Sequence, residues 1–278
     1  MNNHKYLGTA TFYKRALSIA LPIMAQLLIQ NLVSLVDNFM VAGLGDIKMS
    51  GVNIAGQINF VFLVLMNTIC ASGGIFMSQF KGAKDKEGME QTFKFKLIVC
   101  GLIGISYTIL SFIAPRPLFN LMVTTNNDAN IILDYSVIYS KSVALSWLFM
   151  VFSQAIASSL REIEIVKPPL VISIIATLIN TFFNWVFIYG NLGAPRFEVA
   201  GAGYATVIAR FAELAMFIVY AAIKKPEFLF KIKTFLQVKF RLFISIFKKS
   251  AMILYSELTW ALAETISNCP SSVHNNKK

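Results

Sequence analysis

Seven long runs of apolar residues are the feature that most constrains how this sequence folds. A helix needs about 20 mainly apolar residues to cross the hydrocarbon core of a bilayer. Runs of that kind lie at 16–41, 52–79, 97–114, 136–159, 170–190, 201–223 and 246–266. They predict helices that cross a membrane rather than the core of one large soluble domain.

The charge content supports the same prediction. Only 14% of the residues are charged, whereas 56% are hydrophobic. A soluble domain carries roughly 25% charged residues to cover its surface. We therefore predict an all-α, polytopic membrane protein with a six-helix transmembrane bundle and the start of a seventh helix. The first run is too long for a signal peptide and lacks a small-residue cleavage site, so we expect it to be the first span.

Lysine and arginine fall on every second loop. They gather in the N-terminus and in the segments 80–96, 160–169 and 224–249. The alternate loops hold Lys48, Arg116 and Arg196, and Lys141 lies just inside the fourth span. Because basic loops stay in the cytoplasm, we predict a multi-pass protein of the cell (plasma) membrane with a cytoplasmic N-terminus. The alternation explains the formal net charge of +11 without a nucleic-acid partner.

The same pattern divides the chain into five parts. We expect a cytoplasmic N-terminus at 1–15 and an N-terminal six-helix transmembrane bundle at 16–223. A basic cytoplasmic linker at 224–249, a partial seventh helix at 250–266 and an atypical polar tail at 267–278 follow. The basic stretch 224–249 also mixes Phe, Leu and Ile with Lys and Arg. It is therefore compatible with an amphipathic helix on the inner membrane surface, facing anionic head groups.

A polar stripe marks the first span. Gln26, Gln30, Ser34 and Asp37 recur at spacings of three and four residues, which places them on one helix face. A charge at the centre of a membrane helix costs about 2.5–3.5 kcal/mol on insertion scales, so such residues tend to face a bundle interior or a wet cavity. We expect this stripe to face a cavity and Asp37 to hold a proton or a sodium ion. The alternative is a carboxylate solvated at the outer interface.

Two more spans carry uncharged polar stripes. Asn53 and Gln57 lie four residues apart in the second span, with Asn67 further along it, and the fifth span carries Ser173, Thr177, Asn180 and Asn184. Side chains of this kind often do no more than hydrogen-bond neighbouring helices. Three such stripes that could face one another favour a shared polar cavity.

Four further charges lie inside the expected spans. Arg210 and Glu213, three residues apart, can form an ion pair on one helix face. We expect that pair to be structural, with gating as the alternative. Glu257 lies near the middle of the seventh span, with Glu264 one heptad later, and is a second candidate for a titratable site. Its alternative is a lone acid in a helix that does not insert.

The motifs of common enzymes are missing from the sequence. It has no P-loop and no GxGxxG segment after a strand. His4 and His274 lie near the two ends, and Cys70, Cys100 and Cys269 have no metal-ligand spacing. We therefore expect no enzymatic activity, no metal centre, no cofactor and no ATP-driven pump on this chain.

Several segments resemble one known family in order and spacing. The first helix of the multidrug and toxic compound extrusion (MATE) family is similar to LPIMAQLLIQNLVSLVDNFMVAGLG. The end of its second helix and its first cytoplasmic loop are similar to SGGIFMSQFKGAKDKEGME. Its later helices are similar to QAIASSLREIEIVKPPLVISIIATLINTFFNWVFIYG, VAGAGYATVIARFAELAMF and SELTWALAET. The resemblance runs from about residue 14 to about residue 266.

The resemblance implies a cation-coupled antiporter, in which entry of Na⁺ or H⁺ drives export of cationic amphipathic compounds. It also implies two six-helix bundles around a central cavity. By this resemblance, Asp37 matches the family's first-helix aspartate, and Asn180 lies at a fifth-helix position of the same bundle. Asn184 stands where some members carry a second aspartate. Glu257 resembles a seventh-helix acid found in some members. We thus expect cation coupling at these four positions. We expect a cavity lined by Gln26, Gln30, Ser34, Asn53, Gln57 and Thr177.

The length departs from the family. Family members have about twelve helices, whereas this chain has seven expected helices. After Glu264 the sequence continues with the polar segment TISNCPSSVHNNKK, which is unlike the family. We expect a truncated or frameshifted antiporter whose partners are membrane lipid, small amphipathic cations and a missing C-terminal six-helix half. One alternative is an inert or partner-dependent half-transporter. Another is a lipid-linked oligosaccharide flippase, which the acidic, amide-rich stripe disfavours because that substrate carries pyrophosphate.

Overall fold

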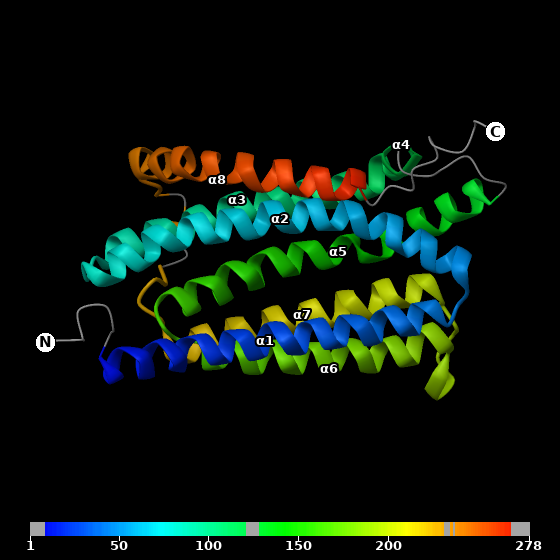
Figure 1. The fold of residues 1–278 in the computed structure, drawn as a ribbon, viewed down its shortest axis with the longest axis horizontal. Coiled ribbons are helices and arrows are strands. Elements are labelled where there is room, and N and C mark those ends of the chain that lie inside the picture. Colours follow the sequence, from blue (N-terminus) through cyan, green and yellow to red (C-terminus); the bar gives the residue numbers. More distant parts are fainter. Residues whose placement is uncertain (1–8, 121–127, 231–233, 236, 268–278) are drawn as a thin grey trace, which may run out of the picture.

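The computed structural model describes residues 9–120, 128–230, 234–235 and 237–267, and within them the chain is almost wholly helical (Figure 1). The side chains of a few residues inside the first and last helices also lie outside the description. The elements are α1 (Ala10–Ala42), α2 (Asp46–Gly82), α3 (Lys86–Ile113), α4 (Pro115–Asn120), α5 (Ala129–Glu162), α6 (Lys167–Tyr189), η1 (Asn191–Gly193), α7 (Val199–Lys224) and α8 (Phe240–Ser267). No strand occurs among these residues, so the predicted all-α fold is confirmed.

Local sequence signals explain where several helices begin and end. The hydroxyl of Thr9 accepts the Phe12 N–H at the start of α1, and the Asp85 carboxylate accepts the Gly88 N–H at 3.0 Å at the start of α3. Such caps satisfy backbone groups that have no partner inside the helix. Gly190 ends α6 with a φ of 76°, a left-handed conformation that glycine adopts without a steric penalty.

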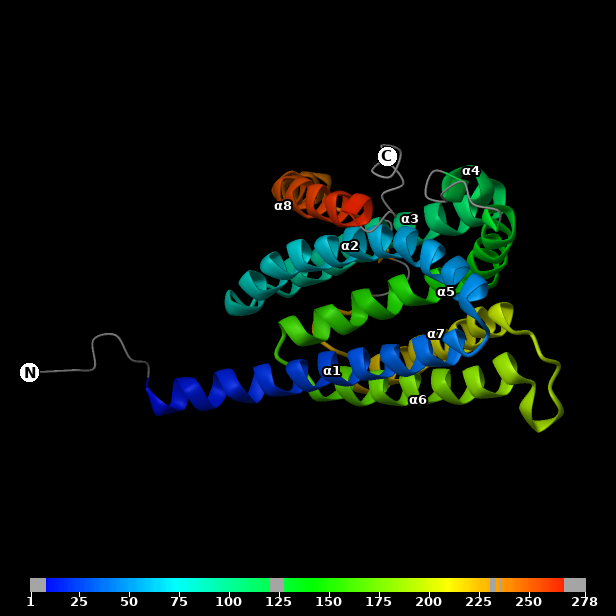
Figure 2. The same cartoon turned by 45° about the vertical axis from the view of Figure 1, so that its right-hand side comes forward.

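Helix α5 occupies the centre of the bundle. It packs against α2 and α3 on one side and against α7 on the other. The two views agree that α6 and α1 continue the layer beyond α7, whereas α8 lies outside α2 and α3 (Figures 1 and 2). The chain therefore forms two groups of long helices that meet along α5.

Close contacts between helices depend on small residues. A Cβ atom added at Gly203 of α7 would lie 2.6 Å from Ser142 Cβ of α5, and one added at Gly51 of α2 would lie 2.7 Å from Tyr135 Cβ of α5. Both distances are shorter than any normal contact. Glycine lets helix backbones approach closely, as is common in membrane bundles.

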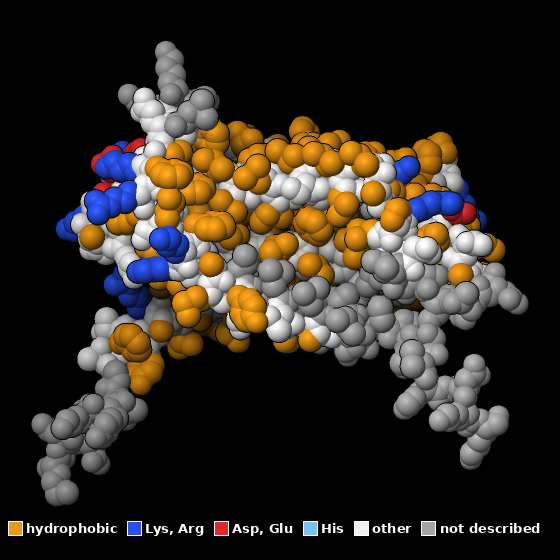
Figure 3. Space-filling model, turned by 90° about the horizontal axis from the view of Figure 1, so that it is seen from above, with side chains coloured by type: hydrophobic (Ala, Val, Ile, Leu, Met, Phe, Trp, Pro, Cys, Tyr) orange, Lys and Arg blue, Asp and Glu red, His pale blue; other side chains and the backbone are white. Residues whose placement is uncertain are grey.

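The outer surface suits a lipid environment. Helices α1, α2, α3, α5, α6 and α7 contain segments long and apolar enough to cross a membrane. Apolar side chains cover the middle of the face in Figure 3, while Lys and Arg side chains cluster mainly towards one end. Six of the seven expected spans fall on these helices, and the protein is a multi-pass membrane protein.

The seventh expected span falls on α8. This helix begins at Phe240, so it takes in the last ten residues of the segment 224–249 that we expected to be a linker. The expected division of the chain otherwise remains a prediction. Most of the expected N-terminal segment and the tail from residue 268 lie outside the described residues.

Candidate functional site

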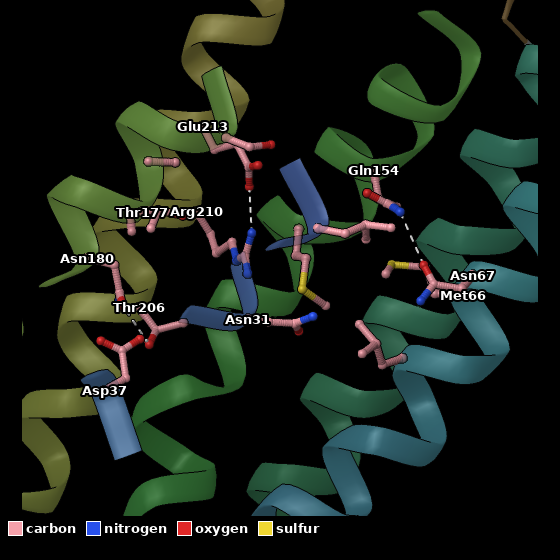
Figure 4. A pocket seen from close by; sticks show the side chains of 16 residues that line it. Asn31, Asp37, Met66, Asn67, Gln154, Thr177, Asn180, Thr206, Arg210 and Glu213 are labelled. Atoms are coloured by element: carbon pink, nitrogen blue, oxygen red, sulfur yellow. Dashed lines mark hydrogen bonds and ion pairs between the residues drawn. The ribbon is translucent and has the colours of Figure 1, made fainter. Parts of the chain in front are cut away.

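A polar cavity of about 630 Å³ lies between α1, α2, α5, α6 and α7 (Figure 4). Its walls combine methionine, leucine and alanine side chains with amides and hydroxyls. Among the described residues that line it, three are charged, namely Asp37, Arg210 and Glu213. The volume of this cavity is in the range of small-molecule sites, but its wall is more polar than is usual for them.

Asp37 lies in the wall of this cavity and is held by amides of α6. The Asn184 side-chain nitrogen donates to Asp37 Oδ1 at 2.9 Å. The Asn180 amide fits two orientations. One places its nitrogen 3.4 Å from Thr206 Oγ1. In that orientation the Asn180 oxygen accepts from the Asn184 nitrogen at 3.3 Å but also faces the Asp37 carboxylate. The other orientation lets the nitrogen donate to Asp37 Oδ2 at 2.8 Å and the oxygen accept from the Thr206 N–H at 3.3 Å, and we assign this one because it removes the contact between two acceptors.

The neighbourhood of Asp37 is rich in oxygen atoms. Its carboxylate lies close to the Asn180 amide, which in turn contacts Thr206 on α7. Asn184 is buried, and its Oδ1 has no hydrogen-bond partner within the described part of the chain. A buried acceptor without a partner costs about 1–3 kcal/mol. A small cation or a water molecule bound there would supply the missing partner.

The stripes predicted on the first and fifth spans meet in the structure. The Gln26 side-chain nitrogen of α1 donates to Ser173 Oγ of α6 at 2.8 Å, and both side chains are buried. Thr177 lines the cavity. The side chains of Gln30 and Ser34 lie outside the described residues.

Gln26 and Asn184 contact residues of the cavity wall without lining it themselves. Three other predicted site residues lie away from the cavity. Asn53 and Gln57 lie near the start of α2, whereas the α2 residues that line the cavity come later, at Leu63, Met66 and Asn67. Glu257 is exposed on α8, which packs on α2 and α3, away from α1, α6 and α7. The spacing of residues along one helix did not reveal how far along the bundle each stripe lies.

Other lining residues were missed or assigned another role. The Gln154 nitrogen of α5 donates to Asn67 Oδ1 of α2 at 3.1 Å across the cavity wall. Thr206 precedes Arg210 by four residues, and Glu213 follows by three, so the same spacing rule that found the other stripes places all three on one face of α7.

The predicted ion pair between Arg210 and Glu213 is confirmed. Arg210 Nη1 lies 2.8 Å from Glu213 Oε2, and the side chains are 37% and 7% exposed, respectively. Both line the cavity that contains Asp37. The pair is therefore part of the candidate site as well as of the helix packing.

A second cavity of about 390 Å³ adjoins the first. Asn67 and Gln154 line both cavities, and the second one extends to Arg161 and Glu162 at the end of α5. No group of three His, Cys, Asp or Glu residues that could hold a metal ion occurs in the part of the chain that the structure describes.

Comparison with known proteins places this arrangement in a family. Residues 22–186 match the family model MatE. The chain is 25% identical over 202 residues to a probable multidrug resistance protein NorM of Idiomarina loihiensis, covering 72% of this chain and 42% of that protein. It is 29% identical over 166 residues to a probable multidrug resistance protein YoeA of Bacillus subtilis, covering 59% and 35%.

A solved structure shares the fold. It is described as the outward-facing conformation of a multidrug resistance MATE family transporter, with a TM-score of 0.77 and 20% identity. The match covers 91% of this chain and 54% of that one. This chain thus spans about half the length of the relatives it matches. These relatives are described as transporters or multidrug resistance proteins, not as enzymes.

Proposed function

Since this chain belongs to the MatE family, we propose that it carries the cation-binding half of an antiporter that exports organic cations or drugs. Na⁺ or H⁺ is the proposed coupling ion, and Asp37 its binding group. The observation that supports this assignment best is the Asp37 carboxylate in the wall of a large polar cavity, with amide nitrogens of Asn184 and Asn180 on its two oxygens.

The chemistry of these groups suits a monovalent cation. Burial separates the Asp37 carboxylate from bulk water, and the loss of hydration makes its negative charge unfavourable. A bound proton or Na⁺ neutralises that charge. Hard cations such as Na⁺ prefer oxygen ligands. The Asp37 carboxylate lines the cavity together with Thr206, and the unpartnered Asn184 oxygen belongs to the amide that contacts Asp37.

Transport follows if the bound ion and the exported cation favour different conformations. A ligand shifts a conformational equilibrium only as far as its affinity for the two states differs. The cavity wall formed by this chain would be completed by a C-terminal six-helix half, in the plasma membrane with the N-terminus in the cytoplasm. The clustering of Lys and Arg towards one end in Figure 3 supports that orientation.

A partner-dependent half-transporter is the second candidate. The matched part corresponds to 54% of one solved relative and 42% of one curated relative. In that case the chain binds the coupling cation but moves no substrate until a second bundle joins it. A lipid-linked oligosaccharide flippase is the weaker alternative, because the cation of the cavity, Arg210, is already paired with Glu213.

Equilibrium binding to the purified chain tests the proposed site. Radioactive Na⁺ and tetraphenylphosphonium are the two probes, and Asp37→Asn keeps the shape of the side chain while removing its charge. We expect saturable binding by the unaltered chain and a loss of at least about tenfold in affinity in the variant, the effect of about 1.4 kcal/mol. Proton release on phosphonium binding would indicate H⁺ as the coupling ion, and competition by Na⁺ would indicate Na⁺.

Glu227→Gln provides the matched control. Glu227 does not line the cavity, and it forms an exposed ion pair with Lys81. The Lys81 Nζ and Glu227 Oε2 atoms are 3.0 Å apart. Its substitution should leave binding unchanged. Equal affinity of Asp37→Asn and the unaltered chain would show that the cation binds elsewhere.

A further inference from the structure

The Arg210 side chain brings a positive charge into the cavity that contains the proposed cation site. Arg210 and Thr206 are separated by four residues on α7, which is about 6 Å along the helix axis. Thr206 contacts Asn180, the residue whose amide reaches Asp37. In Figure 4 the Arg210 side chain points from α7 towards the middle of the cavity, with Glu213 on one side of it and Asp37 on the other.

The two partners of the Arg210–Glu213 pair are held very differently. Glu213 is 7% exposed and, among the described residues, its carboxylate has a single hydrogen-bond donor, which is Arg210. Arg210 is 37% exposed and uses one N–H in that bond, out of the five that a guanidinium carries. Glu213 is therefore a buried group that needs a cation, whereas Arg210 makes one hydrogen bond within the described part of the chain, at the end of a long side chain.

Asp37 is the other acid of this cavity. Both of its oxygens accept amide N–H groups, but it has no ion-pair partner among the described residues. If Glu213 did not hold the guanidinium, Asp37 would be the remaining carboxylate among the described residues that line the cavity with Arg210. An arginine beside Asp37 would occupy the place of a proton or Na⁺.

We propose that Glu213 is a positioning residue that holds the Arg210 guanidinium away from Asp37 and so keeps Asp37 free for the coupling cation. The significance for coupling depends on the function proposed above, while the competition between the two carboxylates for Arg210 does not. Loss of the Glu213 charge thus blocks the Asp37 site even though Asp37 is unchanged. Removal of Arg210 as well reopens it.

Carbodiimide labelling of the purified chain tests this competition. Dicyclohexylcarbodiimide reacts with carboxyl groups in apolar surroundings, and a carboxylate held by a guanidinium reacts poorly. Mass spectrometry of the peptide that contains Asp37 measures the labelled fraction. We expect Glu213→Gln to lower labelling of Asp37 by about tenfold, the effect of one partly buried ion pair. The double variant Glu213→Gln with Arg210→Gln should label like the unaltered chain.

The double variant separates competition from loss of structure. If labelling falls in Glu213→Gln and stays low in the double variant, the loss comes from damaged packing and the proposal is wrong. Unchanged or increased labelling in Glu213→Gln also overturns it, because Arg210 then did not move to Asp37. Glu227→Gln, far from the cavity, should label Asp37 as the unaltered chain does and controls for the general effect of removing one acid.

Prior addition of Na⁺ or tetraphenylphosphonium to the unaltered chain tests the proposed function on the same peptide. Protection of Asp37 by either cation supports cation binding there. If neither cation protects Asp37 but the two Glu213 variants behave as expected, the proposed function fails while the competition for Arg210 stands. If a cation protects Asp37 but the Glu213 variants label Asp37 like the unaltered chain, the proposed cation site stands and the competition for Arg210 is wrong.

Discussion

At the scale of single residues, one missing side chain sets the spacing of α5 and α7. A Cβ atom at Gly203 would lie 2.6 Å from Ser142 Cβ, whereas one at Gly56 of α2 would meet nothing within 4 Å. We expect Gly203→Ala to destabilise the protein by about 1–3 kcal/mol, because the two helices must separate. Gly56→Ala should be neutral or stabilising by up to about 1 kcal/mol, because alanine favours helix.

Thermal unfolding in detergent checks this pair of variants. Cys70 and Cys100 are free and buried, so a thiol-reactive fluorophore reports the loss of packing as these thiols become accessible. The melting temperature of Gly203→Ala should fall below that of Gly56→Ala. Equal melting temperatures would show that α5 and α7 can separate at no cost.

Also at the scale of single residues, the cluster of Asp37, Asn180 and Asn184 contains one acid and two amides. Asn184 donates a hydrogen bond to Asp37, which a carboxylate at position 184 could not do. The family members with a second aspartate at this position would place two acids in contact. Here Asp37 provides the charge, and the amides Asn184 and Asn180 orient it.

At the scale of helices, a buried ion pair joins α3 to the end of α5. The Lys96 ammonium group is fully buried and contacts the Glu162 carboxylate, with Ser158 Oγ at 3.2 Å. Glycine provides the room, since a Cβ atom at Gly73 of α2 would lie 2.7 Å from Lys96 Cε. This arrangement fixes the relative positions of α2, α3 and α5.

Removal of one partner of that pair should be costly. We expect Lys96→Met to destabilise the chain by about 3–5 kcal/mol, because it leaves the mostly buried Glu162 without the ammonium group that it contacts. The double variant Lys96→Met with Glu162→Gln should recover most of the loss, since neither charge then remains. The fluorophore assay measures both. If the double variant were no more stable than Lys96→Met, the ion pair would not be the source of the effect.

At the scale of the whole molecule, the distribution of charge predicts the orientation in the membrane. Single cysteines introduced as Lys84→Cys and Ala194→Cys lie in the α2–α3 and α6–α7 connections, at opposite ends of the bundle. In a background without the native cysteines, a membrane-impermeant maleimide applied to intact cells should label position 194 and not position 84. Labelling of position 84 alone would mean that the N-terminus lies outside the cell.

The positions of six of the seven expected spans could be predicted from the sequence, since they fall on the six described helices that are long and apolar enough to cross a membrane. They follow from the length of each apolar run and from the charge of each loop, which are local properties of a helix in lipid. The same holds for the stripes on the first and fifth spans, because side chains three and four residues apart share a helix face. Asp37, Asn180 and Asn184 were identified in this way and by resemblance, and the structure brings them together.

Only the tertiary structure decided which stripes share a cavity. Periodicity defines a face of one helix but neither its rotation towards a neighbour nor its depth along the bundle. That is why Asn53 and Gln57 were expected in the cavity yet lie outside its lining, whereas Thr206 belongs to it. The Arg210–Glu213 contact was predicted from spacing alone, but its position beside Asp37 depends on how α7 packs against α6 and α5. That packing is set by side-chain volumes on several helices at once, which no single segment of sequence encodes.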